Sequence, residues 1–212
     1  MTPQTELFTR ASVPPSLSDL YLKGCEDCTL SEQSRPVKMR GNWNARVFLG
    51  GEAPGKIEEA NNCTFIGPAG ELLKEALQEL GLNIDKDFLI GNMTQCRPHP
   101  PAGSKKENRA PTAAEISACR YHLETIVEAH NPDLIVLIGG IAASSIMKNY
   151  PGAVGRAVNK FYGPDGHNLS VEADLYVVWH PAYILRNMTD RPKWMRQLTK
   201  LRDYMLGRQL VQ

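Results

Sequence analysis

Leu134-Ile-Val-Leu-Ile138 is the stretch of sequence that decides the fold, and Gly139-Gly140 follow it at once. Its residues are apolar throughout, with no alternation of polar and apolar positions. Such a run is typical of a strand in a parallel sheet that is covered on both faces. Three further runs read in the same way, namely Arg46–Gly50, Asp87–Asn92 and Leu175–Trp179.

Helical patterns separate these strands. Apolar residues fall on one face of Gly70–Leu80, and Thr112 with Glu115 forms a capping box that opens a helix through His130. Further helices are expected from Gly140 to about Asn149 and over Trp194–Leu206. Alternating strands and helices predict a three-layer α/β/α fold around a central four-stranded parallel sheet. We expect a single domain over residues 21–212 and a loose leader, rich in Pro, Ser and Thr, over residues 1–20.

Composition excludes several classes of protein. The chain has 212 residues, of which 42% are hydrophobic and 22% charged, so it can bury a core. No apolar run reaches the ~20 residues that a membrane span needs. A formal net charge of +1 excludes a globally basic nucleic-acid coat but leaves room for a local basic face. The N-terminal residues lack the order of a secretory signal, which favours a cytoplasmic location.

The five cysteines point to a metal site. Their odd number, without an export signal, argues against a disulfide framework. Cys25-Glu-Asp-Cys28 has a spacing shared by redox motifs, zinc sites and iron–sulfur sites. It stands in a polar segment before the first strand, where a redox motif would need a βαβ unit. Cys96 and Cys119 are candidates to complete four ligands, and the alternative is a set of buried, unreactive thiols.

Polar residues follow three of the predicted strands. Glu52 comes after the first strand within Gly51-Glu-Ala-Pro-Gly55, Asn92 ends the second, and His180 follows the last. In a parallel sheet the ligand crevice lies beyond the carboxyl ends of the strands. Each residue has a plain structural explanation as a turn residue, a cap or a solvated charge. Together, a carboxylate, an amide and an imidazole at one sheet edge favour a binding site.

An ordered set of motifs resembles the iron–sulfur, family 4 branch of the uracil-DNA glycosylases. The same group includes phage DNA-polymerase-like proteins. The resemblance runs from about Gly24 to Leu206, and the set is specific although each motif alone is weak. Its members are Gly51-Glu-Ala-Pro-Gly55, Phe65-Ile-Gly67, Ala69-Gly70, Asn92-Met-Thr-Gln-Cys96-Arg-Pro98, Asn108-Arg109-Ala-Pro111 and His180-Pro-Ala182.

The resemblance implies a structural [4Fe–4S] cluster held by Cys25, Cys28, Cys96 and Cys119, with Cys63 left as a free thiol. Four thiolates hold zinc equally well, so ligand type alone does not separate the two metals. Only the resemblance favours iron–sulfur, and zinc stays the alternative.

The resemblance also implies an enzyme that hydrolyses the N-glycosidic bond of uracil in DNA after flipping the base, and leaves an abasic site. His180 is expected to donate a hydrogen bond to uracil O2 as negative charge gathers there. Backbone N–H groups of the turn through Gly51, Ala53 and Gly55 would add donors. Asn92 suits uracil N3–H and O4, and Phe65 would stack on the flipped ring. Glu52 and Glu58 are both candidates for positioning water or stabilising the cationic sugar.

DNA containing uracil, single- or double-stranded, is the expected partner of a monomeric protein. Tyr183, Leu185 and Arg186 are expected to enter the duplex beside the flipped base. Three basic clusters are candidates for phosphate contacts, with a solvated surface as the plain alternative: Arg35, Lys38 and Arg40; Arg97, Lys105, Lys106 and Arg109; Arg191, Lys193 and Arg196.

The sequence departs from the family pattern at two places. Residues 98–107 form an insertion, and Asn62-Cys63-Thr64 replaces the usual lead into the stacking residue Phe65. A related branch that traps DNA covalently has a longer basic insertion ending in a nucleophilic His, which this chain lacks, so covalent trapping is not expected. The alternatives are a glycosylase for another modified base, a catalytically idle DNA-binding module, or a zinc-stapled nucleotide-binding protein. The last of these lacks support, because no Gly-rich phosphate-binding motif follows a strand.

Overall fold

Four parallel strands form the middle of the sheet: β2 (Val47–Gly51), β3 (Leu89–Asn92), β4 (Leu134–Ile138) and β6 (Asp174–Val178). They stand in the order β3-β2-β4-β6. The structure, a computed structural model, describes residues 25–211, so the leader expected at residues 1–20 lies outside the described residues. The four predicted strands are all present, within two residues of their predicted ends.

The predicted number of strands is wrong, because the sheet has six. β1 (Arg40–Gly41) pairs antiparallel with β3, and β5 (Phe161–Tyr162) pairs antiparallel with β6. Both are edge strands of two residues. Two residues are too few to show a period of alternation or a continuous apolar run, so sequence patterns did not reveal them.

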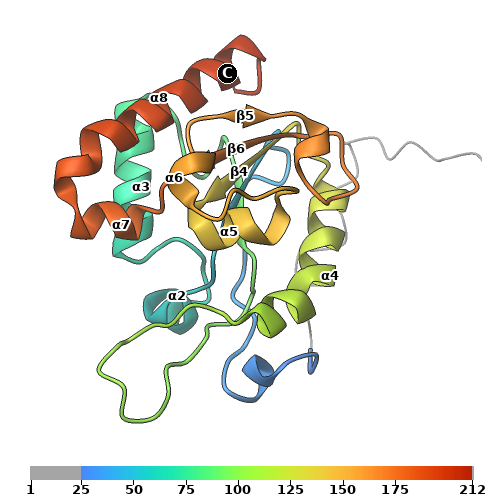
Figure 1. Ribbon diagram of the computed structural model, residues 1–212, viewed down its shortest axis with the longest axis vertical. Helices are drawn as coiled ribbons and strands as arrows, with labels where there is room; N and C mark the ends of the chain where they lie inside the picture. Colours follow the sequence, from blue (N-terminus) through green and yellow to red (C-terminus); the bar gives the residue numbers. More distant parts are fainter. Residues whose placement is uncertain (1–24, 212) are drawn as a thin grey trace, which may run out of the picture.

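Helices cover both faces of the sheet and confirm the three-layer α/β/α fold (Figure 1). One face packs against α3 (Pro68–Glu79), α7 (Pro181–Arg186) and α8 (Arg191–Gly207). The other packs against α4 (Ala113–His130), α5 (Gly139–Ile146) and α6 (Val154–Ala157). Successive residues of one strand point to opposite faces, so Leu49 joins the first core and Phe48 the second.

Local sequence explains where the main helices begin. Thr112 and Glu115 form the predicted capping box at the start of α4, with both reciprocal hydrogen bonds present. Pro68 opens α3 and Pro181 opens α7, positions at which the missing N–H of proline costs no helical hydrogen bond. The helix after β4 is shorter than predicted and ends at Ile146.

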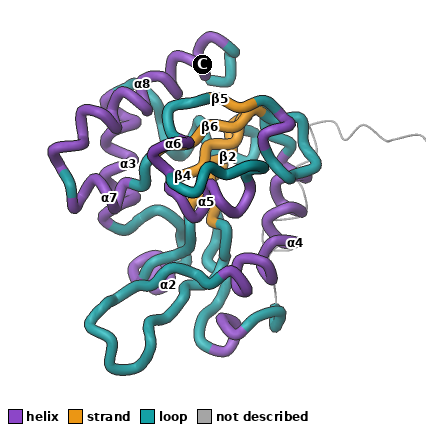
Figure 2. The backbone as a smooth tube through the Cα atoms, in the orientation of Figure 1, coloured by secondary structure: helices purple, strands orange, loops and turns teal. Residues whose placement is uncertain are grey.

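The remaining elements are short and lie outside the sheet. They are α2 (Lys56–Asn61) and the 3-10 turns η1 (Thr29–Glu32), η2 (Pro164–Gly166) and η3 (Met188–Asp190). α2 lies beyond the end of β2, at the lower end of the molecule in Figures 1 and 2. Among the described residues, no helix is both long enough and apolar enough to cross a membrane.

Candidate active site

A cavity opens where β2, β3 and β6 end, and three separate segments supply its walls. The loop after β2 and the start of α3 contribute most of the lining, β3 contributes its last residue, and the start of α7 contributes the histidine. The lining residues are Ala53, Pro54, Glu58, Thr64, Phe65, Ala69, Gly70, Asn92 and His180. The structure therefore brings Ala53, Glu58, Phe65, Asn92 and His180, all singled out from the sequence, to one cavity.

His180 is held as a neutral imidazole with a defined tautomer. It is the N-cap of α7, and its Nδ1 accepts a hydrogen bond from the Ala182 N–H at 3.1 Å. Because Nδ1 is the acceptor, the ring proton is on Nε2. Burial lowers the pKa of His180 to about 4, and the positive charge of Arg186 adds to the shift. His180 therefore offers the cavity a neutral N–H donor.

Gly139 makes room for this imidazole. Its φ of +91° lies in the region that favours glycine, and a Cβ there would meet His180 Cβ at 3.0 Å. The Gly139-Gly140 that marked the end of a strand in the sequence thus also has a role in packing the site. A side chain at position 139 would push against the ring of His180.

The Asn92 amide is oriented by a buried threonine. Asn92 is 3% exposed, and its Nδ2 donates to Thr64 Oγ1 at 2.7 Å. This contact occupies one of the two amide N–H groups and leaves Oδ1 and the second N–H. The sequence marked Thr64 only as part of the Asn62-Cys63-Thr64 departure from the family pattern, since a hydroxyl in a loop gives no sign of the strand end that it will meet.

Phe65 lies against the turn after β2. Its side chain lines the cavity, and a Cβ on Gly51 would come within 2.6 Å of the ring. The backbone of Phe65 has φ +56°, a left-handed conformation that is rare for a bulky residue. A Cβ on Gly70 would approach the Phe65 carbonyl oxygen to 2.1 Å, so Gly70 permits this turn.

The two candidate carboxylates are placed differently. Glu58 lines the cavity, and its Oε1 accepts a hydrogen bond from the Gly67 N–H at 2.9 Å. A Cβ on Gly55 would meet Glu58 Oε2 at 2.7 Å, so this glycine keeps the carboxylate uncrowded. Glu52 is half-buried outside the lining, and burial raises the pKa of its carboxyl group. Of the two, only Glu58 faces the cavity.

On α7, one of the three side chains expected to contact DNA is hydrogen-bonded within the protein and two are exposed. Tyr183 donates its hydroxyl to Asp190 and packs edge-on against Trp179. Leu185 is 43% exposed, and Arg186 is also exposed. Met188, 53% exposed, follows them and was not singled out from the sequence. Leu185 and Arg186 are therefore accessible beside the His180 loop, whereas Tyr183 contacts Asp190 and Trp179.

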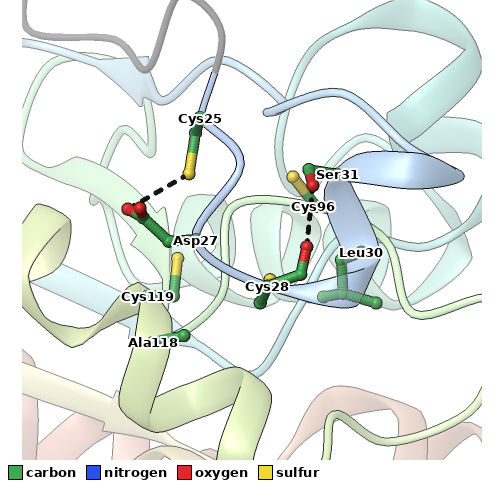
Figure 3. Close-up of a pocket in the computed structure, with 8 residues that line it drawn as sticks. All are labelled: Cys25, Asp27, Cys28, Leu30, Ser31, Cys96, Ala118 and Cys119. Carbon is green, nitrogen blue, oxygen red and sulfur yellow. Dashed lines mark hydrogen bonds between the residues drawn. The ribbon is translucent and has the colours of Figure 1, made fainter.

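Four cysteines from three segments line a second pocket (Figure 3). Cys25 and Cys28 come from the N-terminal segment, Cys96 from the loop after β3 and Cys119 from α4. The fifth, Cys63, is not among its lining residues. The Gln95 N–H donates to Cys119 Sγ at 3.3 Å. The structure thus brings together the four cysteines proposed as ligands and leaves out the one that was not.

The thiols of this pocket fit a metal centre. Burial raises the pKa of Cys96 to about 12 and that of Cys119 to about 11, and the neighbouring thiols add to both shifts. Thiols desolvated in this way resist ionisation unless a cation offsets their charge, as a bound metal does, and Cys96 and Cys119 are both in this position. His122 and Asp27 lie next to Cys25, at 3.6 Å and 3.5 Å from its Sγ.

A half-buried carboxylate joins the segment after the first two cysteines to the insertion. Glu59 of α2 accepts hydrogen bonds from Ser34 at 2.6 Å, Arg97 at 2.9 Å and His99 at 2.8 Å. Lys56 pairs with Glu107 at the far end of the insertion, which loops out beside α2 in Figure 1. Arg97 is thus used inside the protein, while Lys105 and Lys106 stay exposed.

Comparison of the sequence with known proteins shows its family. Residues 39–201 match the sequence profile of the uracil DNA glycosylase superfamily. The chain belongs to this superfamily. The type-4 uracil-DNA glycosylase of Pyrobaculum aerophilum is 31% identical over 84% of this chain and 87% of its own length. That of Thermotoga maritima is 30% identical over 87% of this chain and 89% of its own length.

A Bacillus phage SP01 protein named DNA polymerase is also similar, at 26% identity over 85% of this chain. The match covers only 18% of the phage protein. These findings confirm the resemblance to family 4 and to phage DNA-polymerase-like proteins that the motifs indicated. Within the uracil DNA glycosylase superfamily, the cavity at the ends of β2, β3 and β6 is the candidate active site.

Proposed function

We propose that this protein is a uracil-DNA glycosylase of base excision repair. It hydrolyses the N-glycosidic bond of a flipped uracil and leaves an abasic site. The observation that carries the proposal is the convergence of Asn92, Phe65, Glu58 and His180 on one cavity at the carboxyl edge of the sheet. The type-4 uracil-DNA glycosylases among its relatives support the same activity.

In this mechanism the base departs as an anion. The Nε2–H of neutral His180 donates a hydrogen bond to uracil O2, where the negative charge develops. Backbone N–H groups of the turn from Gly51 through Ala53 to Gly55 add donors to the same region. A neutral donor that is fixed beforehand needs no rearrangement as the charge forms, which lowers the barrier.

The rest of the cavity selects the base and assists the sugar. Asn92 Oδ1 accepts uracil N3–H, and its free N–H donates to O4, whereas cytosine presents the reverse polarity. Phe65 stacks on the flipped ring. Glu58 positions water or stabilises the cationic sugar, a role that we assign to it ahead of Glu52 because Glu58 lines the cavity.

DNA is the partner that this site requires. Leu185 and Arg186 at the exposed end of α7 enter the gap left by the base, beside Tyr183, whose hydroxyl is bound to Asp190. The domain spans residues 21–212. The protein acts as a monomer in the cytoplasm, a compartment that suits five cysteines without a disulfide among the described residues.

Cys25, Cys28, Cys96 and Cys119 hold a [4Fe–4S] cluster, with zinc as the alternative metal. The group is structural: it ties the N-terminal segment to the loop after β3 and to α4. The similarity to type-4 enzymes favours iron–sulfur over zinc, and the shared pocket of the four thiols supports a single centre.

The direct test is base release. The pure protein is incubated with a single-stranded oligonucleotide that carries one uracil, and alkali then cleaves any abasic site. We expect scission at the uracil and none in the matched oligonucleotide with thymine. Scission at another modified base but not at uracil would favour a glycosylase of different specificity, and DNA binding without any scission would favour an idle module.

Replacing Thr64 by Val lowers kcat/KM for uracil about tenfold. Valine keeps the shape of the side chain but removes the acceptor that orients Asn92, and an orphaned buried amide N–H costs roughly 1–3 kcal/mol. Steady-state kinetics on a uracil oligonucleotide measure the change. Thr125→Val on the exposed face of α4 is the matched control and keeps wild-type kinetics; equal losses in both variants would contradict the role of Thr64.

We expect the pH dependence of the activity to show no step at the ordinary pKa of a histidine. Burial lowers the pKa of His180 from 6.5 to about 4, so its neutral form persists throughout the neutral range. The stability that this group contributes is fully present above pH 6.5 and is lost as the pH falls toward 4. In a pH–rate profile, the step assigned to His180 appears only at acidic pH. A step near pH 6.5 that vanishes in His180→Gln would contradict this assignment.

A further inference from the structure

The backbone of Phe65 is unusual among the described residues. Six non-glycine residues have positive φ, and the other five are Asn or Gln: Asn62, Asn131, Asn149, Asn159 and Gln209. Asparagine tolerates this region, whereas a bulky aromatic residue does so only when its surroundings hold it there. The conformation of Phe65 therefore needs a cause outside the residue itself.

Arg40 contacts the Phe65 peptide directly. Its Nη1 donates to the Phe65 carbonyl oxygen at 3.0 Å, while Nε and Nη2 bind the two carboxylate oxygens of Asp85 at 2.5 Å and 2.8 Å. The guanidinium is thus fixed by a two-pronged ion pair on one side and holds the Phe65 peptide on the other. The Arg40 side chain is only 13% exposed.

This placement differs from the phosphate contact that the sequence suggested for Arg40. Three of its N–H-bearing nitrogens already have partners within the protein, which leaves little for a DNA backbone. Arg40 belongs to β1. The pairing of β1 with β3, in which Arg40 stands opposite Ile90, places Arg40 beside the 62–67 loop. The edge strand missed by sequence patterns therefore carries the side chain that binds the Phe65 carbonyl.

We propose that Arg40 is a positioning residue that fixes Phe65 in its left-handed conformation and so holds the ring as the stacking wall of the base cavity. The inference rests on the proposed function. The Phe65 ring stands so close to Gly51 that a Cβ there would come within 2.6 Å of it, and a change of φ at Phe65 would shift its Cβ and ring relative to this turn. Arg40 acts through Phe65 and touches no substrate.

The first test is the Arg40→Met variant, with free uracil as the probe. Methionine keeps much of the apolar stem but donates no hydrogen bond. Losing a charged donor makes uracil bind about tenfold more weakly, as measured by product inhibition, and raises KM similarly with a smaller change in kcat. In a Phe65→Leu background the same substitution has no further effect, because the group through which it acts is gone.

A charge-swapped variant separates positioning from stability. Arg40→Asp with Asp85→Arg restores the ion pair but not the donor to the Phe65 carbonyl. We expect the swap to recover thermal stability without recovering uracil affinity. Recovery of both together would overturn the proposal, and so would Arg40→Met losses that are additive with Phe65→Leu.

The alternative, in which Arg40 contacts a DNA phosphate, predicts a different result. If Arg40 contacts DNA, Arg40→Met weakens binding of DNA and reduces its salt dependence, while inhibition by free uracil stays unchanged. A crystal structure of Arg40→Met gives a readout independent of activity: φ of Phe65 leaves the positive region if Arg40 holds it, and stays there if it does not. Failure of wild type to release uracil would refute the proposed function without altering that structural result.

Discussion

Replacing His180 by Ala lowers kcat/KM for uracil release about 10²–10³-fold, the usual cost of removing one preorganised donor to a developing oxyanion. The loss falls mainly on kcat, since the interaction strengthens as the base becomes an anion. Single-turnover kinetics on a uracil oligonucleotide measure it. The visible absorbance of the metal centre stays unchanged, because His180 and the four cysteines line different pockets.

The chain offers a matched control for this variant. His167 is 1% exposed, and its Nδ1 accepts the Leu169 N–H two residues on, just as His180 Nδ1 accepts that of Ala182. Its Nε2 donates to the Ala173 carbonyl, so both ring nitrogens serve the fold. His167→Ala lowers thermal stability but keeps kcat. If the two variants lost activity to the same extent, His180 would be a structural residue and the mechanism would fail.

Replacing Cys96 by Ser abolishes the metal centre. Cys96 is the most buried of the four candidate ligands, and its loss leaves three thiols that cannot complete the centre. Loss of a structural metal site is expected to lower the free energy of unfolding by more than about 4 kcal/mol. For a chain of this length, that corresponds to a fall in Tm of roughly 10 °C or more. Metal analysis and thermal melting measure both effects.

Cys63→Ser is the control for the cysteine variant. Cys63 does not line the pocket, so its replacement leaves the metal content and Tm as in wild type. We expect iron and acid-labile sulfide in the wild-type protein and in Cys63→Ser. If zinc were found instead of iron and sulfide, the four cysteines would bind zinc and not an iron–sulfur cluster. Equal metal content in wild type, Cys63→Ser and Cys96→Ser would contradict the proposed ligand set.

The sequence predicts the sheet centre because its strands are long and apolar on both faces. Leu134–Ile138 and its neighbours carry enough residues for the pattern to be unambiguous, and the Thr112 capping box marks α4 by chemistry alone. β1 and β5 have two residues each, and each is a strand only because it pairs with a longer neighbour, β3 or β6. Their existence depends on tertiary pairing, which a local pattern does not contain.

The sequence shows which polar residues follow the strands, but not how their side chains are arranged around the cavity. Asn92 and His180 stand at strand ends, where topology alone makes them meet. Glu58 lines the cavity and Glu52 does not, because Glu58 lies on α2. The orientation of the Asn92 amide depends on its hydrogen bond to Thr64. The left-handed turn at Phe65 rests on Arg40, Gly51 and Gly70, which come from separate segments.

The most direct measurement is a crystal structure of the protein with uracil bound. The account predicts uracil in the cavity at the ends of β2, β3 and β6, with O2 about 2.7–3.2 Å from His180 Nε2, N3 and O4 on the Asn92 amide and the ring against Phe65. Uracil bound at another surface, or bound here with O2 turned away from His180, would contradict it.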